Sequence, residues 1–259
     1  MGLMSRPELS PVPSEHPGTP TSSLSARERL HGQTLLFDAD DTLWENNIYF
    51  ERAIAAFISF LDHRVHTQEE VREHLNHCER ATIAKHGYGV KSFRRSLVNC
   101  FEQLSGAPPT PERHARILAF ADSIAEHEIE LLAGVPETLR ELHTRHRLLL
   151  VTKGHPAEQM DKVERSGLQD FFQAVEVLPE KHSDAYLALR QKHGCEAETT
   201  WMIGNSPKSD INPALAAGLN AVFIPHDFTW VLEHETVDAP AGTSRLLELG
   251  GFQELLQYF

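Results

Sequence analysis

The chain has 259 residues, of which 41% are hydrophobic and 24% charged, and its formal net charge is -13. These proportions are ordinary for a soluble globular protein, and the length suffices for one large domain or a main domain carrying a smaller one. The acidic excess disfavours non-specific binding to nucleic acid or anionic membranes, and no apolar run approaches the length of a membrane span. An anionic substrate would therefore need a local positive site.

The N-terminal segment, residues 1–32, is rich in Pro, Ser and Thr and poor in large apolar side chains. Because it cannot bury enough surface to offset its chain entropy, we predict a disordered tail. It lacks the charged-then-apolar pattern of a secretory signal. The three cysteines are widely spaced and form no CxxC pair, so reduced thiols in a cytoplasmic protein are the simplest interpretation.

An apolar run at 34–37 stops at Asp38, as a buried parallel strand does, and is followed by a dense acidic stretch, "DADD". The next region, residues 45–132, has apolar residues at helical spacing in 53–61, 93–104 and 115–132. Breaks fall at 86–89 and 106–111. This pattern predicts an all-helical insertion of about four helices.

From residue 133 onward the pattern alternates between strand and helix. Strands are expected at 147–152, 174–178, 199–204, 220–225 and 245–249, with helices at about 156–166, 183–193, 210–217 and 251–258. Such alternation is typical of a parallel sheet covered on both faces. We therefore predict an α/β protein whose discontinuous core, residues 33–44 and 133–259, is a Rossmann-like parallel sheet.

Polar residues follow four of the predicted strands, where ligands bind in sheets of this kind. They are Asp38 to Thr42, Thr152 to Gly154, Lys181, and the run "GNSPKSD" from Gly204 to Asp210. Carboxylates, an ammonium and a hydroxyl at one edge suit metal-assisted phosphoryl transfer. A hard cation shields an attacking carboxylate, while a lysine and a hydroxyl hold the phosphoryl oxygens. A second acid two residues along exchanges protons with the leaving group and water.

The run "FDADDTLW" resembles the DxDxT signature of the haloacid dehalogenase superfamily, and the other strand ends follow in that family's order and approximate spacing over residues 33–225. The resemblance implies Mg²⁺ as cofactor, with Asp38 as nucleophile and metal ligand and Asp210 as a further ligand. It implies that Asp40 is the general acid/base and binds the metal through its backbone carbonyl. Thr152, with neighbouring backbone amides, and Lys181 would hold the phosphoryl group.

Two positions depart from the family pattern. Asn205 stands where an aspartate is usual, so we expect a metal site with one negative charge fewer, to which the amide still contributes directly or through a bound water. Lys181 is followed by His-Ser-Asp rather than the frequent Pro-containing run, which weakens the helix start but leaves the ammonium.

Several residues near these motifs have two readings. Lys153 and Gly154 adjoin Thr152 as substrate-binding candidates, although Lys153 also fits a salt bridge or solvent, and Asp41 fits a structural cap of the next turn. Residues 85–96, with Tyr88 and Arg94, form either a cap loop that reads the leaving group or an ordinary turn with solvated bases. For His74, His77 and Cys78 we favour a solvated helix face over the alternative interpretation, a zinc site.

The leading functional hypothesis is a Mg²⁺-dependent phosphomonoester hydrolase acting on a small metabolite through an aspartyl-phosphate on Asp38. By the resemblance, the helical insertion at residues 45–132 would be a cap that closes over the site, excludes water and disfavours macromolecular substrates. Dehalogenation would need neither Asp40 nor a metal. A phosphomutase, or a degenerate member that binds a phosphorylated ligand without turnover, remains an alternative. The sequence specifies neither the substrate nor the oligomeric state.

Overall fold

The computed structural model describes residues 29–61 and 65–259. The predicted N-terminal tail lies outside the described residues up to residue 28. Its last residues do have a position: the amide of Leu30 donates to the carbonyl oxygen of Tyr258 at 2.7 Å. The described part of the chain therefore begins against its own C-terminus, ahead of the first strand.

A six-stranded parallel sheet forms the centre of the core, in the order β3-β2-β1-β4-β5-β6. The strands are β1 (Thr34–Phe37), β2 (Arg147–Lys153), β3 (Ala174–Leu178), β4 (Thr200–Gly204), β5 (Asn220–Phe223) and β6 (Leu246–Glu248). Phe37 lies beside Leu150 of β2 and Ile203 of β4, so the first acidic motif leaves the middle of the sheet. The predicted Rossmann-like α/β class is confirmed.

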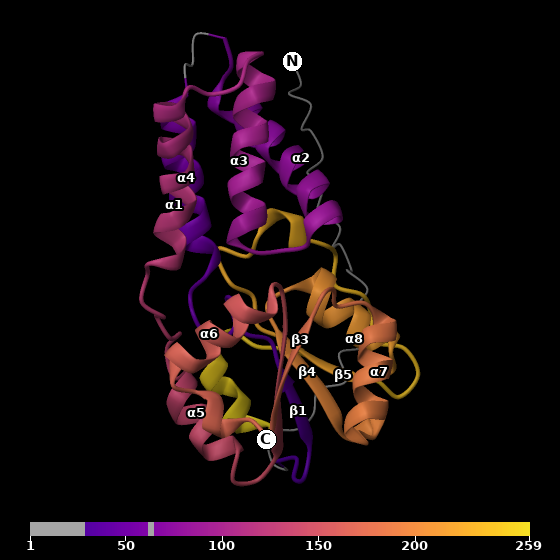
Figure 1. The fold of residues 1–259 in the computed structure, drawn as a ribbon. Coiled ribbons are helices and arrows are strands. Elements are labelled where there is room, and N and C mark those ends of the chain that lie inside the picture. Colours follow the sequence, from indigo (N-terminus) through magenta and orange to yellow (C-terminus); the bar gives the residue numbers. More distant parts are fainter. Residues whose placement is uncertain (1–28, 62–64) are drawn as a thin grey trace, which may run out of the picture.

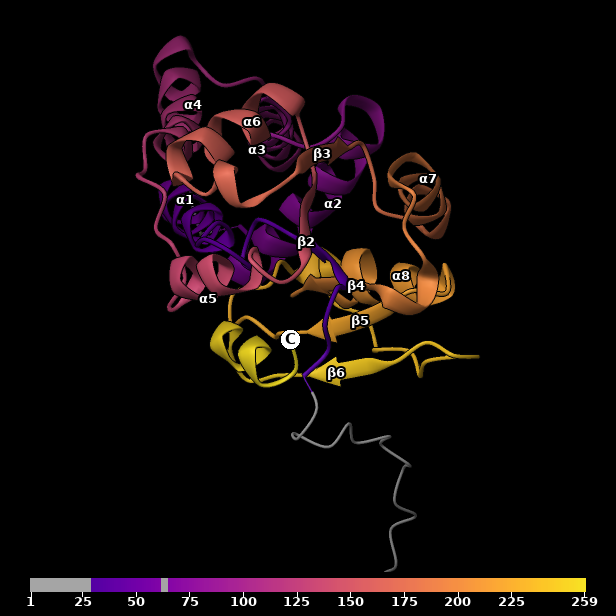
Figure 2. The same ribbon diagram turned by 90° about the horizontal axis from the view of Figure 1, so that it is seen from below.

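Helices cover both faces of the sheet (Figures 1 and 2). One apolar cluster joins α5 (Val135–Leu142), α6 (Pro156–Ser166) and the 3-10 helix η5 (Phe252–Gln257) to one face. A second joins α7 (Ser183–His193) and α8 (Asn212–Ala216) to the other. Burial on both faces explains why the strands are apolar throughout rather than alternating.

Four helices form a separate layer beyond the carboxyl ends of the strands (Figure 1). They are α1 (Asn47–Phe60), α2 (Gln68–His86), α3 (Val90–Ser105) and α4 (Pro111–Ala125), with an apolar core of their own. Polar caps fix two helix starts: Thr67 and Glu70 form a capping box before α2, and Thr110 caps α4. This helical cap lies directly over the strand ends.

The structure corrects two predicted helices. The helix expected over 115–132 stops at Ala125, because residues 130–132 pair with the other linker instead: Glu45 N donates to Glu130 O and Leu132 N to Leu43 O, both at 2.9 Å. The helix expected over 210–217 begins earlier, as a π-helix at Pro207–Ile211 that continues into α8. Within the described residues, no helix combines the length and apolarity that crossing a bilayer would require.

Candidate active site

The ten residues singled out from the sequence all line one cavity of about 410 Å³ between the sheet and the cap. From the core come Asp38, Asp40, Thr152, Lys153, Gly154, Lys181, Asn205 and Asp210, and from the cap Tyr88 and Arg94. The core residues meet because β3, β2, β1 and β4 are neighbours and point the same way. The strand order, which the sequence leaves open, is what brings them together.

Lys181 ties two buried carboxylates together at the base of the cavity. Its Nζ donates to Asp38 Oδ1 at 2.5 Å and to Asp210 Oδ1 at 2.8 Å. Asp210 Oδ2 also accepts from the amide of Ser206 at 3.0 Å, which fixes the carboxylate's orientation. A Cβ on Gly204 would fall 2.3 Å from Asp210 Oδ2, so only glycine at the end of β4 leaves room for this carboxylate.

The electrostatics of this group leave negative charge in excess. Burial and the neighbouring Asp210 raise the pKa of Asp38 to about 7, although the Lys181 ammonium acts in the opposite direction. One ammonium thus faces two desolvated carboxylates. Hard oxygen ligands with uncompensated charge are the donor set that Mg²⁺ prefers, so the residues present fit the metal that the sequence predicts.

Asn205 presents its oxygen to this group. Its Nδ2 donates to Thr229 Oγ1 at 2.9 Å, which directs Oδ1 towards Thr42. Thr42 Oγ1 lies 3.0 Å from Asp38 Oδ2 and 3.3 Å from Asn205 Oδ1, and so connects the two. The amide therefore offers the site a neutral oxygen where a carboxylate would have brought a charge.

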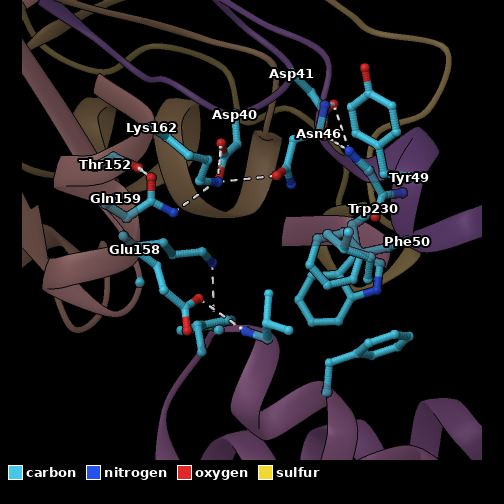
Figure 3. A pocket seen from close by; sticks show the side chains of 18 of the residues that line it. Asp40, Asp41, Asn46, Tyr49, Phe50, Thr152, Glu158, Gln159, Lys162 and Trp230 are labelled. Carbon is cyan, nitrogen blue, oxygen red and sulfur yellow. Dashed lines mark hydrogen bonds and ion pairs between the residues drawn. The ribbon is translucent and has the colours of Figure 1, made fainter. Parts of the chain in front are cut away.

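The carboxylate of Asp40 is held by contacts that the sequence did not reveal (Figure 3). Lys162 Nζ lies 2.6 and 2.7 Å from its two oxygens, Gln159 Nε2 donates at 3.0 Å, and Trp44 Nε1 donates at 2.7 Å. Burial alone would raise the pKa of Asp40, but the charge of Lys162 and these three donors together lower it. An ammonium from α6 thus favours the ionised form of Asp40.

The Thr152 hydroxyl belongs to the same chain of contacts. It lies 3.3 Å from Gln159 Oε1, while the Gln159 amide nitrogen donates to Asp40. Gly154, at φ 146°, faces this glutamine closely, with Nε2 3.0 Å from the position of an added Cβ. The end of β2 and the first turns of α6 therefore orient the Asp40 carboxylate and the Thr152 hydroxyl together.

Lys153 is in the cavity wall but is already paired. Its Nζ lies 2.7 Å from Glu233 Oε1 and from Ser209 Oγ, and 4.6 Å from the centre of the Tyr88 ring. Burial acts to lower its pKa, but Glu233, Tyr88 and Glu180 together raise it. Lys153 therefore forms a salt bridge, whereas Lys181 is the ammonium that contacts Asp38.

Asp41 has the structural role considered from the sequence. Its backbone is left-handed, with φ 61°, and Oδ1 accepts from the amides of Asn46 and Asn47 at 2.9 Å. It thus holds the entry to α1. At α7, the His182 ring accepts from the amide of Ala185 at 3.1 Å, so the histidine that replaces the expected proline run supplies the cap itself.

The best metal-ligand geometry in the described residues outside the base of the cavity is not the histidine cluster considered from the sequence. Asp41, Glu45 and His226 each bring one ligand atom to within 4.8 Å of the others. His226 Nε2 lies 3.3 Å from Glu45 Oε2 and His226 Nδ1 3.9 Å from Asp41 Oδ1, so contacts among the three side chains account for the grouping. His74 and Cys78 both lie against the side-chain oxygen of Gln103.

The loop at the start of α3 closes the cavity against the core. Tyr88 donates its hydroxyl to Glu180 at 2.7 Å, and Glu158 of α6 accepts from the amide of Val90 at 3.0 Å. Gly89 must remain glycine here, since an added Cβ would lie 2.8 Å from Glu158 Oε2 at φ 121°. Arg94 faces the cavity but is paired with Asp122 of α4.

Two comparisons place the chain in a family. A family model described as haloacid dehalogenase-like hydrolase matches residues 33–218. A haloacid dehalogenase-like family hydrolase from Xanthomonas campestris matches with 30% identity and a TM-score of 0.71, covering 86% of this chain and 92% of its own. The chain belongs to the haloacid dehalogenase-like hydrolases. A search of curated proteins returned no match.

More distant structures share the fold of this hydrolase. The putative hydrolase YfnB from Bacillus subtilis, bound to magnesium, has 19% identity and a TM-score of 0.62 over 88% of this chain and 98% of its own. The L-2-haloacid dehalogenase from Xanthobacter autotrophicus has 15% identity and a TM-score of 0.60 over 86% and 96%. Because the shared fold accompanies different chemistries, the reaction must be argued from the side chains.

Sequence reasoning missed the residues that hold the motifs in place, chiefly Lys162, Gln159, Glu233 and Thr229. A lysine or glutamine on a helix gives no local signal of the partner it meets across the sheet. For Lys162 and Gln159 a clue did exist: they follow the Thr152 motif by one to three helical turns, on the helix that a parallel crossover places beside the strand ends.

Proposed function

We propose that this hydrolase is a Mg²⁺-dependent phosphomonoesterase acting on a small phosphorylated metabolite through an aspartyl-phosphate on Asp38. The observation that carries the proposal is the pairing of a buried Asp38–Lys181–Asp210 group with a second, separately held carboxylate at Asp40. Dehalogenation has no use for an acid/base two residues after the nucleophile. Phosphoryl transfer uses both groups.

In the first half-reaction, an oxygen of Asp38 attacks phosphorus and the bond to the leaving-group oxygen breaks. Lys181 neutralises charge on the phosphoryl group, and Thr152 donates a hydrogen bond to it. Protonated Asp40 transfers its proton to the departing alkoxide. Bound Mg²⁺, held by Asp38, Asp210 and the carbonyl of Asp40 with Asn205 nearby, would supply positive charge beside the nucleophile and phosphate.

In the second half-reaction, Asp40 accepts a proton from the water that attacks the aspartyl-phosphate, and inorganic phosphate leaves with Asp38 regenerated. The proton taken from water in one turnover is the one delivered to the leaving group in the next. Lys162 and Gln159 favour the ionised form and so prepare Asp40 for this step. The cap covers the cavity and limits the water that reaches the intermediate.

The decisive experiment is hydrolysis of p-nitrophenyl phosphate with Mg²⁺ and with excess EDTA. We expect equimolar nitrophenol and phosphate, release that depends on Mg²⁺, and recovery when Mg²⁺ is restored. Turnover that persists in EDTA would contradict the mechanism. Release of halide from a 2-haloacid, without phosphatase activity, would replace the proposed phosphatase function with dehalogenation. If the enzyme does hydrolyse p-nitrophenyl phosphate, a screen of phosphorylated metabolites would then identify the substrate class.

A further inference from the structure

The cavity does not end at the catalytic group but extends into the helical cap. Its upper wall is largely apolar and consists of Phe50 of α1, Ile83 of α2, Val90 and Phe93 of α3, and Ile124 of α4. Tyr49, Phe50 and Trp230 bring aromatic rings to one side of the opening (Figure 3). This arm has the character of a site for the leaving group rather than for phosphate.

One carboxylate interrupts this apolar wall. Glu79 lies on α2 seven residues before its last residue, His86, which is roughly 10 Å along the helix from its core-facing end. It is only 5% exposed and lines the cavity together with Ile83, one turn nearer the core. Among the residues that the structure describes, its Oε2 has no hydrogen-bond partner. A buried carboxylate oxygen without a donor is costly, so its retention at a cavity wall needs a reason.

The charge of Arg72, which acts on Glu79, is already engaged elsewhere. Arg72, about two turns earlier on α2, forms a two-pronged pair with Glu51 of α1, at 2.9 and 2.7 Å. Its charge is therefore shared with a second carboxylate. Lys153, Lys162 and Lys181, the lysines at the core side of the cavity, are each bonded to acids of the core. Glu79 is left as a desolvated acceptor facing an apolar space.

We propose that Glu79 is a specificity-determining residue that binds a cationic end of the substrate. The inference rests on the proposed function and narrows its substrate class. The substrate would be a phosphomonoester whose leaving group has a short, mainly apolar chain and a terminal ammonium. The phosphate would sit at Asp38 and Lys181, the chain between the cap helices, and the ammonium against Glu79.

The kinetic test compares ω-aminoalkyl phosphates with ω-hydroxyalkyl phosphates of the same length, from two to six carbons. For the best length we expect kcat/KM to favour the amine at least tenfold in the wild type, since a site with a buried acceptor discriminates strongly by charge and hydrogen bonding. Glu79→Gln keeps the shape and should remove most of that ratio. Glu73→Gln, exposed on the same helix, should retain it. Equal rates for amine and alcohol in the wild type, or an unchanged ratio in Glu79→Gln, would overturn the inference.

A binding test separates this inference from the catalytic proposal. Thermal unfolding is measured with millimolar 6-aminohexanol and 3-aminopropanol and with the matching diols, none of which carries phosphate. Stabilisation by an amine but not its diol, lost in Glu79→Gln and kept in Glu73→Gln, supports the cation site. Absence of any such difference overturns it. If no phosphate ester is hydrolysed, the proposed function fails, and the binding test still decides the role of Glu79.

Discussion

The strand-end group and the cap arm handle buried charge in opposite ways. At the sheet edge every motif carboxylate has a partner: Lys181 bonds Asp38 and Asp210, and Lys162 bonds Asp40. In the cap, Glu79 lines the cavity, and no donor in the described part of the chain contacts its Oε2. The same kind of group is therefore satisfied within the protein in one region and left to an external partner in the other.

This difference separates chemistry from selection. The core provides oriented acids and ammoniums that can act on the phosphoryl group whatever the leaving group is. In the proposed function, the largely apolar arm of the cap, with Glu79 in its wall, would distinguish leaving groups without touching a reacting atom. Changes in the first region should thus affect all substrates, and changes in the second should affect their ranking or the stability of the cap.

The largest effect is expected at the nucleophile. Asp38→Asn should lower kcat for p-nitrophenyl phosphate by about 10⁴-fold or more, because the amide cannot form the aspartyl-phosphate. Asp170→Asn, an exposed site in the core, serves as the matched control. Thermal unfolding must show that both variants are folded. Undiminished turnover in Asp38→Asn would contradict the assignment of the chemistry to the strand-end group.

A smaller loss is expected when the partner of Asp40 is removed. Lys162→Met should lower kcat by about 100-fold, the usual scale of acid/base contributions, because it leaves a buried carboxylate without its ammonium. Lys162→Arg should recover part of the rate by restoring the charge. Steady-state kinetics on two unrelated phosphate esters provides the readout. A change in kcat confined to one ester would mean that Lys162 contacts the leaving group rather than acting through Asp40.

Glu79 should make stability depend on pH. Burial is the main cause that raises its carboxyl pKa from 4.5 to about 7, with Glu51 adding to it and Arg72 opposing it. Between pH 4.5 and 7 the Glu79 carboxyl is therefore protonated in the folded protein and ionised in the unfolded chain. Its contribution to the free energy of unfolding is fully present below pH 4.5 and is lost as the pH rises through 7. Because glutamine does not ionise, the free energy of unfolding of Glu79→Gln should rise relative to that of the wild type by on the order of 3 kcal/mol between pH 4.5 and 8.

Urea unfolding at the two pH values measures this gain. The difference between variant and wild type cancels the contributions of Asp38 and Asp41, whose pKa values are also raised to about 7. Glu73→Gln should show no such pH-dependent difference. A flat difference for Glu79→Gln would indicate that the carboxylate is compensated within the cap, and the contrast with the core would disappear.

The charge of the metal site in the core can be changed by a single substitution at Asn205. Asn205→Asp should lower the half-saturating Mg²⁺ concentration by about tenfold or less, because a charged oxygen replaces the neutral one beside Thr42 while the donation to Thr229 is lost. Thr229→Val, which removes that acceptor together with the donation from Thr229 Oγ1 to the carbonyl oxygen of His226, is the control for the lost hydrogen bond. An unchanged Mg²⁺ dependence in Asn205→Asp would place this side chain outside the region that senses the ion.

The smallest effect concerns the contact that holds the cap closed. Tyr88→Phe removes the hydroxyl that donates to Glu180 at 2.7 Å and accepts from Lys153 Nζ at 3.3 Å. Because both hydrogen bonds are lost, KM should rise about two- to tenfold with little change in kcat. Tyr258→Phe, a half-buried tyrosine of the core, is a suitable control. A large fall in kcat would instead assign Tyr88 to the chemistry.

Much of the core followed from local patterns. Apolar runs that end abruptly in polar residues predicted β1, β2, β3 and β4 to within one residue of their observed bounds, because a strand buried on both faces must be apolar until it leaves the sheet. The cap was harder. The helical periodicity continued past Ala125, yet pairing of the two linkers, through Leu43 and Leu132, ended the helix there.

By itself, the sequence determined the family, the parallel sheet and the residues that meet at its edge, since these depend on motifs next to strands and on the direction those strands must share. Tertiary structure alone decided which charges are paired. Lys162 reaches Asp40 across 122 positions of sequence, and Lys153 meets Glu233 across 80. It also left Glu79 without a donor, because no local pattern records which neighbours a helix face will acquire when cap and core come together.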